Sequence, residues 1–155
     1  MILYEEFVNL LLDKYSSVKV EVKSPIQYYG GKSFLANEIL RLIPPHTCYV
    51  EPFFGSGQVF FQKKRSKVEV INDLYDLVYC FFKVLSDKKL FNQFIRKVVV
   101  MFPHEKIFNE YKENIETEKD IVNKAVMYFY LNRFSFNGLC QSFAISVEKN
   151  KSKFF

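Results

Sequence analysis

The sequence of 155 residues contains no tryptophan, few cysteines and few histidines. The three cysteines, Cys48, Cys80 and Cys140, are odd in number, and no two of them form a C-x-x-C pair. This spacing argues against a disulfide framework and against a cysteine metal site, and it favours reduced thiols. His46 and His104, the only two histidines, fit no metal-binding pattern. We therefore expect a chain without structural disulfides or metal.

A long hydrophobic run is also missing. A membrane-spanning helix needs roughly 18 consecutive apolar residues, and Glu5 and Glu6 interrupt even the first apolar stretch. We expect no membrane association and a cytoplasmic location. Hydrophobic residues make up 49% of the chain, which is enough for one modest core. The net charge of +5 suits a polyanionic partner, although such a mild excess also occurs in proteins that bind no nucleic acid.

The segment before Pro25 predicts two elements. Residues 4–15 have apolar positions at helical spacing, and residues 18–23 alternate Val with charged residues, as a half-buried strand does. We interpret residues 1–24 as an N-terminal extension.

The centre of the sequence is the run Tyr49-Val50-Glu51-Pro52-Phe53-Phe54-Gly55-Ser56-Gly57. It predicts a buried strand that ends in an acid and leads into a binding loop at the carboxyl edge of a parallel sheet. Gly55 and Gly57 can take positive φ, and without a Cβ they let a ligand approach the main chain. An ordinary tight turn is the alternative, because Gly-x-Gly alone is a weak pattern.

The residues after this turn extend the pattern to a βαβ unit. Residues 58–64 predict a short helix, and residues 68–71 predict a second strand that ends at Asn72-Asp73. Asp73 follows Gly57 by 16 residues, close to the ~20-residue interval at which an acid binds the ribose of a nucleotide cofactor. Asp73 could instead cap the apolar helix predicted after it. Together with the glycine turn, the ligand interpretation is favoured.

An earlier turn, Gly30-Gly31-Lys32-Ser33, looks at first like the end of a phosphate-binding P-loop. That motif requires a glycine where Ile26 stands, so we reject it. What remains is a flexible turn that places Lys32 near the start of a helix, where it could hold a carboxylate or phosphate. A solvated lysine is the alternative. The apolar positions of the predicted helix are Leu35, Ile39, Leu42 and Ile43.

Three segments, Tyr28 to Lys32, Val50 to Gly57 and Ile71 to Tyr75, resemble the N-terminal half of the Dam-type (D12 class) DNA adenine-N6 methyltransferases, in the same order. The resemblance implies an α/β protein with a partial Rossmann-like S-adenosylmethionine-dependent methyltransferase fold and a helical DNA-recognition insert. It also implies a set of residues around S-adenosylmethionine, namely Tyr28, Lys32, Glu51, Phe53, Gly55, Gly57 and Asp73.

The second half predicts helices at 88–100, at 104–115 after Pro103, and at 118–133. Residues 128–140 resemble the DNA-recognition segment of the same family, with Tyr128, Phe129 and Tyr130 expected in the core. In the family, the residues at Phe136 and Asn137 contact DNA around the displaced adenine. We expect four DNA-binding residues, Arg133, Phe136, Asn137 and Gln141. Gln141 stands where relatives often carry an arginine that reads guanine, so their target sequence does not carry over.

Adenine-N6 transfer in this family depends on an Asp-Pro-Pro-Tyr segment, which these 155 residues do not contain. We therefore predict a site-specific DNA adenine-N6 methyltransferase present as a fragment or split subunit; the alternative is an inactive binding module for S-adenosylmethionine or DNA. The predicted divisions are an extension (1–24), a cofactor-binding part (25–87) and a helical DNA-recognition region (88–155). The expected partners are double-stranded DNA and either a second polypeptide or a second copy, because a partial sheet exposes strand edges.

Overall fold

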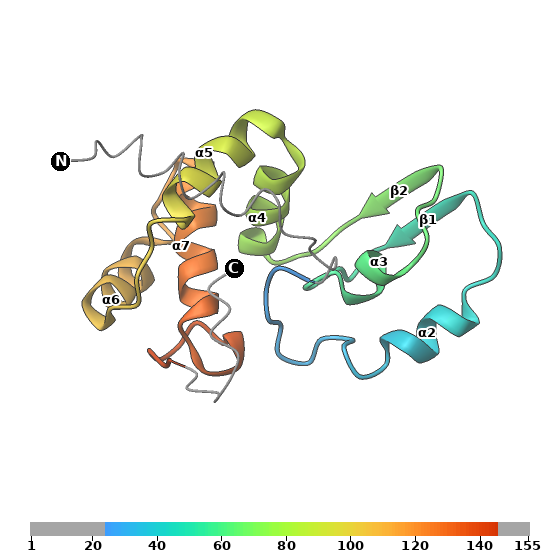
Figure 1. Cartoon of the computed structure of the whole chain (residues 1–155), viewed down its shortest axis with the longest axis horizontal. Coiled ribbons are helices and arrows are strands. Elements are labelled where there is room, and N and C mark those ends of the chain that lie inside the picture. Colours follow the sequence, from blue (N-terminus) through green and yellow to red (C-terminus); the bar gives the residue numbers. More distant parts are fainter. Residues whose placement is uncertain (1–23, 146–155) are drawn as a thin grey trace.

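The computed structural model describes residues 24–145 (Figure 1). The elements in chain order are α2 (Ala36–Leu42), β1 (Cys48–Glu51), α3 (Gln58–Gln62), β2 (Val68–Ile71), α4 (Asp76–Ser86), α5 (Lys88–Val98), α6 (Glu105–Asn114), α7 (Ile121–Arg133) and the 3-10 turn η1 (Phe136–Gly138). The elements predicted at 4–15 and 18–23 lie outside the described residues. Within residues 24–145, no helix is long and apolar enough to cross a membrane.

The two strands form a small parallel sheet. Cys48 pairs with Val68 and Glu51 pairs with Ile71, and α3 connects the strands. The strand predicted at 68–71 is confirmed, and the helix predicted at 58–64 ends two residues earlier, at Gln62. The described chain is thus a mixed α and β structure. Its two parallel strands are connected by a helix, as the glycine turn and the two apolar runs indicated.

Among residues 24–145, no element covers one face of this sheet. Alternate strand residues share a face, so aligned partners place Cys48, Val50, Val68 and Val70 side by side. Val50 is 57% exposed and Val70 is 47% exposed. The expectation of a buried first strand is therefore wrong for its apolar side chains, and in β1 only Glu51 is buried. We call these four residues the open sheet face.

The helix α2 differs from its expected pattern in the same way. Its apolar residues recur at helical spacing, yet Leu42 is 82% exposed and only Ala36 is buried. Helical spacing identifies an apolar stripe, but it does not say whether another element covers that stripe.

The helices α4 to α7 pack into a lobe around α7, which contacts each of the other three. Figure 1 shows this lobe on one side and the strands with α2 and α3 on the other. Phe81 of α4 stacks on Phe129 of α7 and meets Phe94 of α5 edge to face. Tyr128 and Tyr130 are buried as predicted. We refer to residues 76–145 as the helical lobe and to residues 24–75 as the strand part.

Side-chain caps distinguish the last three helices, α5, α6 and α7, from the three helices before them. Asp87, His104 and Asp120 begin α5, α6 and α7, and each accepts a backbone N–H of the first turn. The helix predicted at 104–115 begins one residue later than predicted, at Glu105, and its N-cap is His104. In contrast, α2, α3 and α4 begin without a side-chain cap.

The strand part is attached to the helical lobe by aromatic packing. Phe54, in the turn after β1, is buried, and its ring centroid lies 4.7 Å from that of Phe82 on α4 in an edge-to-face arrangement. Phe60 and Phe61 of α3 surround the same ring. The turn that follows β1 is therefore held between α4 and α3 by the Phe54 ring.

Candidate cofactor and DNA site

A buried carboxylate stands at the carboxyl end of β1. Glu51 is 5% exposed, and its Oε1 lies 2.9 Å from Nζ of Lys32, which comes from the Gly30-Gly31 turn. Lys32 also donates a hydrogen bond to the carbonyl of Phe53. The contact between Lys32 and Oε1 is one of charge, since among residues 24–145 Oε1 accepts no well-directed hydrogen bond. A buried oxygen in this state can accept a hydrogen bond from a ligand.

The other carboxylate oxygen is held by Tyr49. The Tyr49 hydroxyl donates to Oε2 of Glu51 over 3.1 Å. Burial and the nearby Glu51 raise the pKa of Tyr49 above its ordinary value, so the hydroxyl keeps its proton and remains a donor. Lys63 lies 4.4 Å from the centre of the Tyr49 ring and pairs with Glu69 of β2. On the sheet face that Tyr49 shares with Glu51 and Glu69, each of the two glutamates thus pairs with a lysine.

Asp73 joins the ends of the two strands. Its Oδ2 accepts the N–H of Gly55 over 2.6 Å, and its Oδ1 accepts the N–H of Tyr75 over 3.0 Å. The alternative in which Asp73 caps the next helix is wrong, because α4 begins after Tyr75 without a side-chain cap. A carboxylate has about four acceptor positions, so Asp73 can hold the glycine turn and still accept hydroxyl groups of a ligand.

The two glycines of the turn are required by the fold itself. Gly55 and Gly57 have φ of 57° and 71°. A Cβ at Gly57 would lie 2.5 Å from the Phe54 ring, and a Cβ at Gly55 would lie 3.3 Å from the Tyr28 ring. The space beside Gly57 is therefore filled by the protein's own side chains, and these glycines alone do not distinguish a ligand site from a tight turn.

Two cavities each border one of the predicted donor-site residues, Asp73 in one and Tyr28 in the other. One of about 260 Å³ lies beside Asn72 and Asp73 and is walled by Phe54, Tyr79 and Phe82. A larger one of about 880 Å³ runs from Tyr28 and Gly31 past Gln58 to Arg133 and Asn137. Burial and the charge of Asp73 raise the pKa of Tyr28. Phe53 is 81% exposed, and the structure gives it a main-chain contact with Lys32.

The predicted DNA-binding residues lie at the end of α7 and on the loop after it. Phe136 is 64% exposed, and Asn137 is exposed with φ of 51°, a left-handed conformation that asparagine tolerates. Arg133 and Gln141 are exposed as well. The structure thus places all four side chains on one surface segment.

The backbone of this loop is fixed despite its exposed tip. The Cys140 N–H donates to Ser135 Oγ, and Lys112 Nζ of α6 donates to the Gln141 carbonyl over 2.7 Å. Ser135 also forms a bridge with Phe143. Cys140 has a positive φ of 58°, a conformation that persists only where surrounding contacts maintain it. An exposed aromatic on a fixed backbone suits insertion into a base stack.

Two residues of the site were not assigned a role from the sequence. Tyr49 holds Glu51, and buried Asn132 binds both Gln27 and Gly138. A usable signal existed for Asn132, since it lies seven residues after buried Ala125 and so on the same side of α7. A polar residue on the inner face of a helix requires partners.

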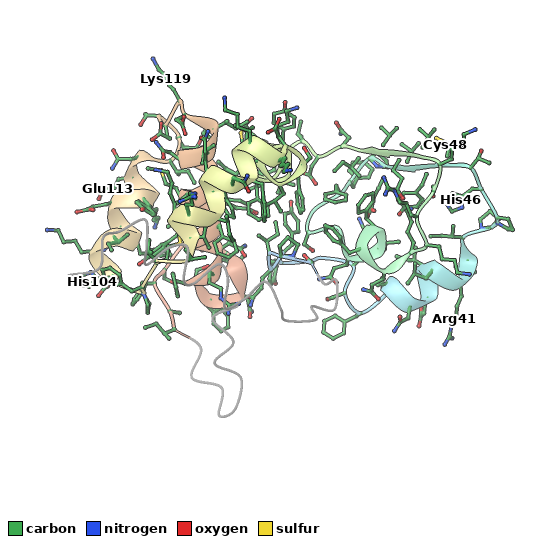
Figure 2. The ribbon with its side chains drawn as sticks, turned by 45° about the horizontal axis from the view of Figure 1, so that its top comes forward. Arg41, His46, Cys48, His104, Glu113 and Lys119 are labelled. Carbon is green, nitrogen blue, oxygen red and sulfur yellow. The ribbon has the colours of Figure 1, made fainter. Side chains whose placement is uncertain are left out.

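The two histidines do not share a site. His46 and His104 lie at opposite ends of the molecule (Figure 2). No cluster of three His, Cys, Asp or Glu side chains able to hold a metal ion exists in the described part of the chain.

Comparison with known proteins identifies a matching family. The D12 class N6 adenine-specific DNA methyltransferases match residues 28–146. The DNA adenine methylase of Escherichia coli K12 is 32% identical over 123 residues, which cover 75% of this chain and 42% of that protein. The DNA adenine methylase of Salmonella typhi is 32% identical over 120 residues, with the same shares covered. The chain spans less than half the length of these relatives.

Proposed function

The chain belongs to the D12 class of N6 adenine-specific DNA methyltransferases, and we propose that its strand part binds the methyl donor S-adenosylmethionine while its helical lobe contacts double-stranded DNA. The reaction is transfer of the donor's methyl group to N6 of an adenine in DNA. We propose a partial Rossmann-like arrangement for the strand part, supported by the parallel β1-α3-β2 unit and by the glycine turn at its carboxyl edge.

The observation that carries the donor site is the buried Glu51 with its unsatisfied Oε1, beside Lys32 and near Asp73. S-adenosylmethionine has an ammonium group, a carboxylate and a ribose diol, and it supplies an electrophilic methyl group when bound. Glu51 suits the ammonium group, Lys32 the carboxylate, and Asp73 the ribose hydroxyls. Tyr28, Phe53, Gly55 and Gly57 would form the walls of this site.

The DNA contact is proposed for the loop after α7. Phe136 fills the space left by a displaced adenine, and Asn137 hydrogen-bonds exposed base edges. Arg133 lies where it can approach the phosphate backbone, and Gln141 faces the bases from the same loop. Because such a surface binds phosphates through charge, the affinity for DNA should fall as salt rises.

Methyl transfer also needs acceptors for the protons of the adenine amino group, since these localise its lone pair toward the methyl group. We propose that a second polypeptide supplies such groups, since a second copy of the chain has the same residues, and that this polypeptide or a second copy packs on the open sheet face. Its exposed valines favour a partner. Sedimentation should show association, and a monomer at high dilution and at high concentration alike would contradict this proposal.

The proposal is tested by calorimetric titration of the full chain with S-adenosylmethionine. Glu51→Gln removes the charge of the buried carboxylate, and Glu69→Gln is the matched control on the neighbouring strand. Losing a charge-assisted hydrogen bond of about 1.5–3 kcal/mol should weaken binding by roughly ten- to a hundredfold in Glu51→Gln. Equal binding by the wild type and both variants, or no binding by the wild type, would refute the donor site.

A binding module without transfer activity is the second candidate. The 155 residues contain no Asp-Pro-Pro-Tyr segment. A transfer assay with labelled donor and duplex DNA separates the two. Transfer that appears on adding a polypeptide with that segment supports the enzyme. DNA binding with no transfer under that supplementation supports the module.

A further inference from the structure

Asn132, near the end of α7, is a buried side chain whose amide makes three hydrogen bonds to backbone groups. It is 3% exposed. Its Oδ1 accepts the N–H of Gln27 over 2.9 Å, and its Nδ2 donates to the carbonyl of Gln27 over 2.8 Å and to the carbonyl of Gly138 over 3.1 Å. Two of its partners are thus backbone groups of one residue, 105 positions away in sequence.

The segments that Asn132 joins also touch one another. Gly138 has φ of 70°, and a Cβ built on it would lie 2.7 Å from Cβ of Gln27 and 2.9 Å from Nδ2 of Asn132. Only glycine leaves room for this contact. The turn before Gly30 and the loop after α7 are therefore packed directly together, with the Asn132 amide between them.

Each of these segments leads directly to one of the two proposed binding sites. Gln27 precedes Tyr28, whose ring packs against Gly55 in the glycine turn. Gly138 follows Asn137 at the exposed tip of the loop. An asparagine amide suits the junction because it accepts and donates at once, whereas an aspartate of the same shape only accepts.

We propose that Asn132 is a positioning residue that fixes the donor site and the DNA-contacting loop relative to each other. This inference rests on the proposed function, because it assigns a purpose to the link between two proposed sites. Asn132 lines the larger cavity, but it is not among the residues proposed to contact either ligand. Its effect is therefore on the geometry of both, and on the coupling of the two ligands.

The structural test is amide hydrogen exchange of the full chain with Asn132→Asp, which keeps the shape and removes both donated bonds. Exchange should rise about tenfold or more in residues 25–31 and in residues 135–141 together. Exchange in α5, away from the junction, should stay unchanged. Asn114→Asp is the matched control, because Asn114 Nδ2 also donates to a backbone carbonyl, that of Glu110, on exposed α6.

The functional test measures duplex DNA affinity with and without saturating S-adenosylhomocysteine. In the wild type, one ligand should strengthen binding of the other by roughly fivefold or more. This ratio should fall to one in Asn132→Asp and remain in Asn114→Asp. Gly138→Ala disturbs the same junction from the loop and should give the same loss, which covers the case in which the aspartate variant does not fold.

The outcomes separate the two claims. Faster exchange in only one segment, or an unchanged coupling ratio in both junction variants, would overturn the positioning role while the proposed function stands. A wild-type chain that binds neither ligand would overturn the proposed function and, with it, the purpose assigned to Asn132.

Discussion

The helical lobe and the strand part both contain many apolar residues, but they differ in how much of this apolar surface they bury. In the lobe, α7 is surrounded by three helices, and its aromatic residues interlock with Phe81 and Phe94. In the strand part, Val50, Val68 and Val70 are exposed on the open sheet face. The lobe has an aromatic core of its own, although Phe102 and Phe136 are exposed. The strand part instead packs on the lobe through Phe54 and is bonded to it through Asn132.

The first prediction has the largest expected effect on stability and compares a buried residue of the lobe with a residue of the open sheet face. Phe81 is 1% exposed, and Phe81→Ala should cost about 3–5 kcal/mol of unfolding free energy through the cavity it leaves. Val70→Ala on the open sheet face should change it by less than about 0.5 kcal/mol. Denaturant unfolding of both variants provides the measurement. A cost for Val70→Ala near that for Phe81→Ala would mean that the sheet face is covered in solution.

The second prediction concerns the point where the two parts meet. Gly57→Ala adds a Cβ that would sit 2.5 Å from Phe54, in addition to the strain of a positive φ, and should destabilise the chain by roughly 2–3 kcal/mol. Gly30→Ala is the matched control, because Gly30 has the same φ of 71° with nothing within 4 Å. It should cost about 1–2 kcal/mol, from strain alone. Equal urea midpoints for the two variants would show that Phe54 moves aside freely.

The third prediction tests the capped helices of the lobe. Asp120 Oδ1 accepts the N–H of Asn123 over 2.7 Å at the start of α7. Removing this cap in Asp120→Ala should cost about 1 kcal/mol, and Asp120→Asn should cost less, because asparagine caps equally well. Thermal unfolding of the pair measures the difference. If both variants lose the same stability, the charge of Asp120 rather than its cap would be responsible.

The smallest effect is one of pH. Hydrogen bonds from the N–H groups of Leu90 and Lys89 hold the pKa of Asp87 below its ordinary value. A carboxyl whose pKa is lower in the folded state stabilises the fold above its unfolded pKa of about 3.9, and this contribution is lost as pH falls through the lower folded value. Asp87→Asn caps α5 without titrating. Its unfolding free energy should therefore depend less steeply on pH between about 4.5 and 2.5 than that of the wild type, and identical slopes would contradict this.

The positions of the elements could be read from the sequence because each has a local signal. The second strand, the helices of the lobe and the turn at Gly55 were predicted from spacing or residue type within a few positions. Burial was harder, since the apolar stripe of α2 and the valines of the sheet have the pattern of covered faces without a described residue to cover them. The spacing of apolar residues identifies the apolar face of a helix or strand, but tertiary packing determines whether that face is buried.

The candidate site could be predicted only in part from the sequence, for the same reason. Lys32 and Glu51 were named separately, and the structure pairs them. For Asp73, the structure excludes the capping role, because α4 begins without a side-chain cap, and the ligand role stays a prediction. The hydrogen bonds between Asn132 and Gln27 join residues 105 positions apart in sequence, so no local pattern could predict them.

The most direct test of the proposal that the strand part binds the methyl donor is photo-crosslinking of methyl-labelled S-adenosylmethionine to the full chain, followed by peptide mapping. The account predicts label on peptides of the strand part, from residues 26–33 and 51–75, and its loss on competition with unlabelled S-adenosylhomocysteine. Label on α5 or α6, or label that the competitor does not remove, would contradict the assignment of the donor site to the strand part.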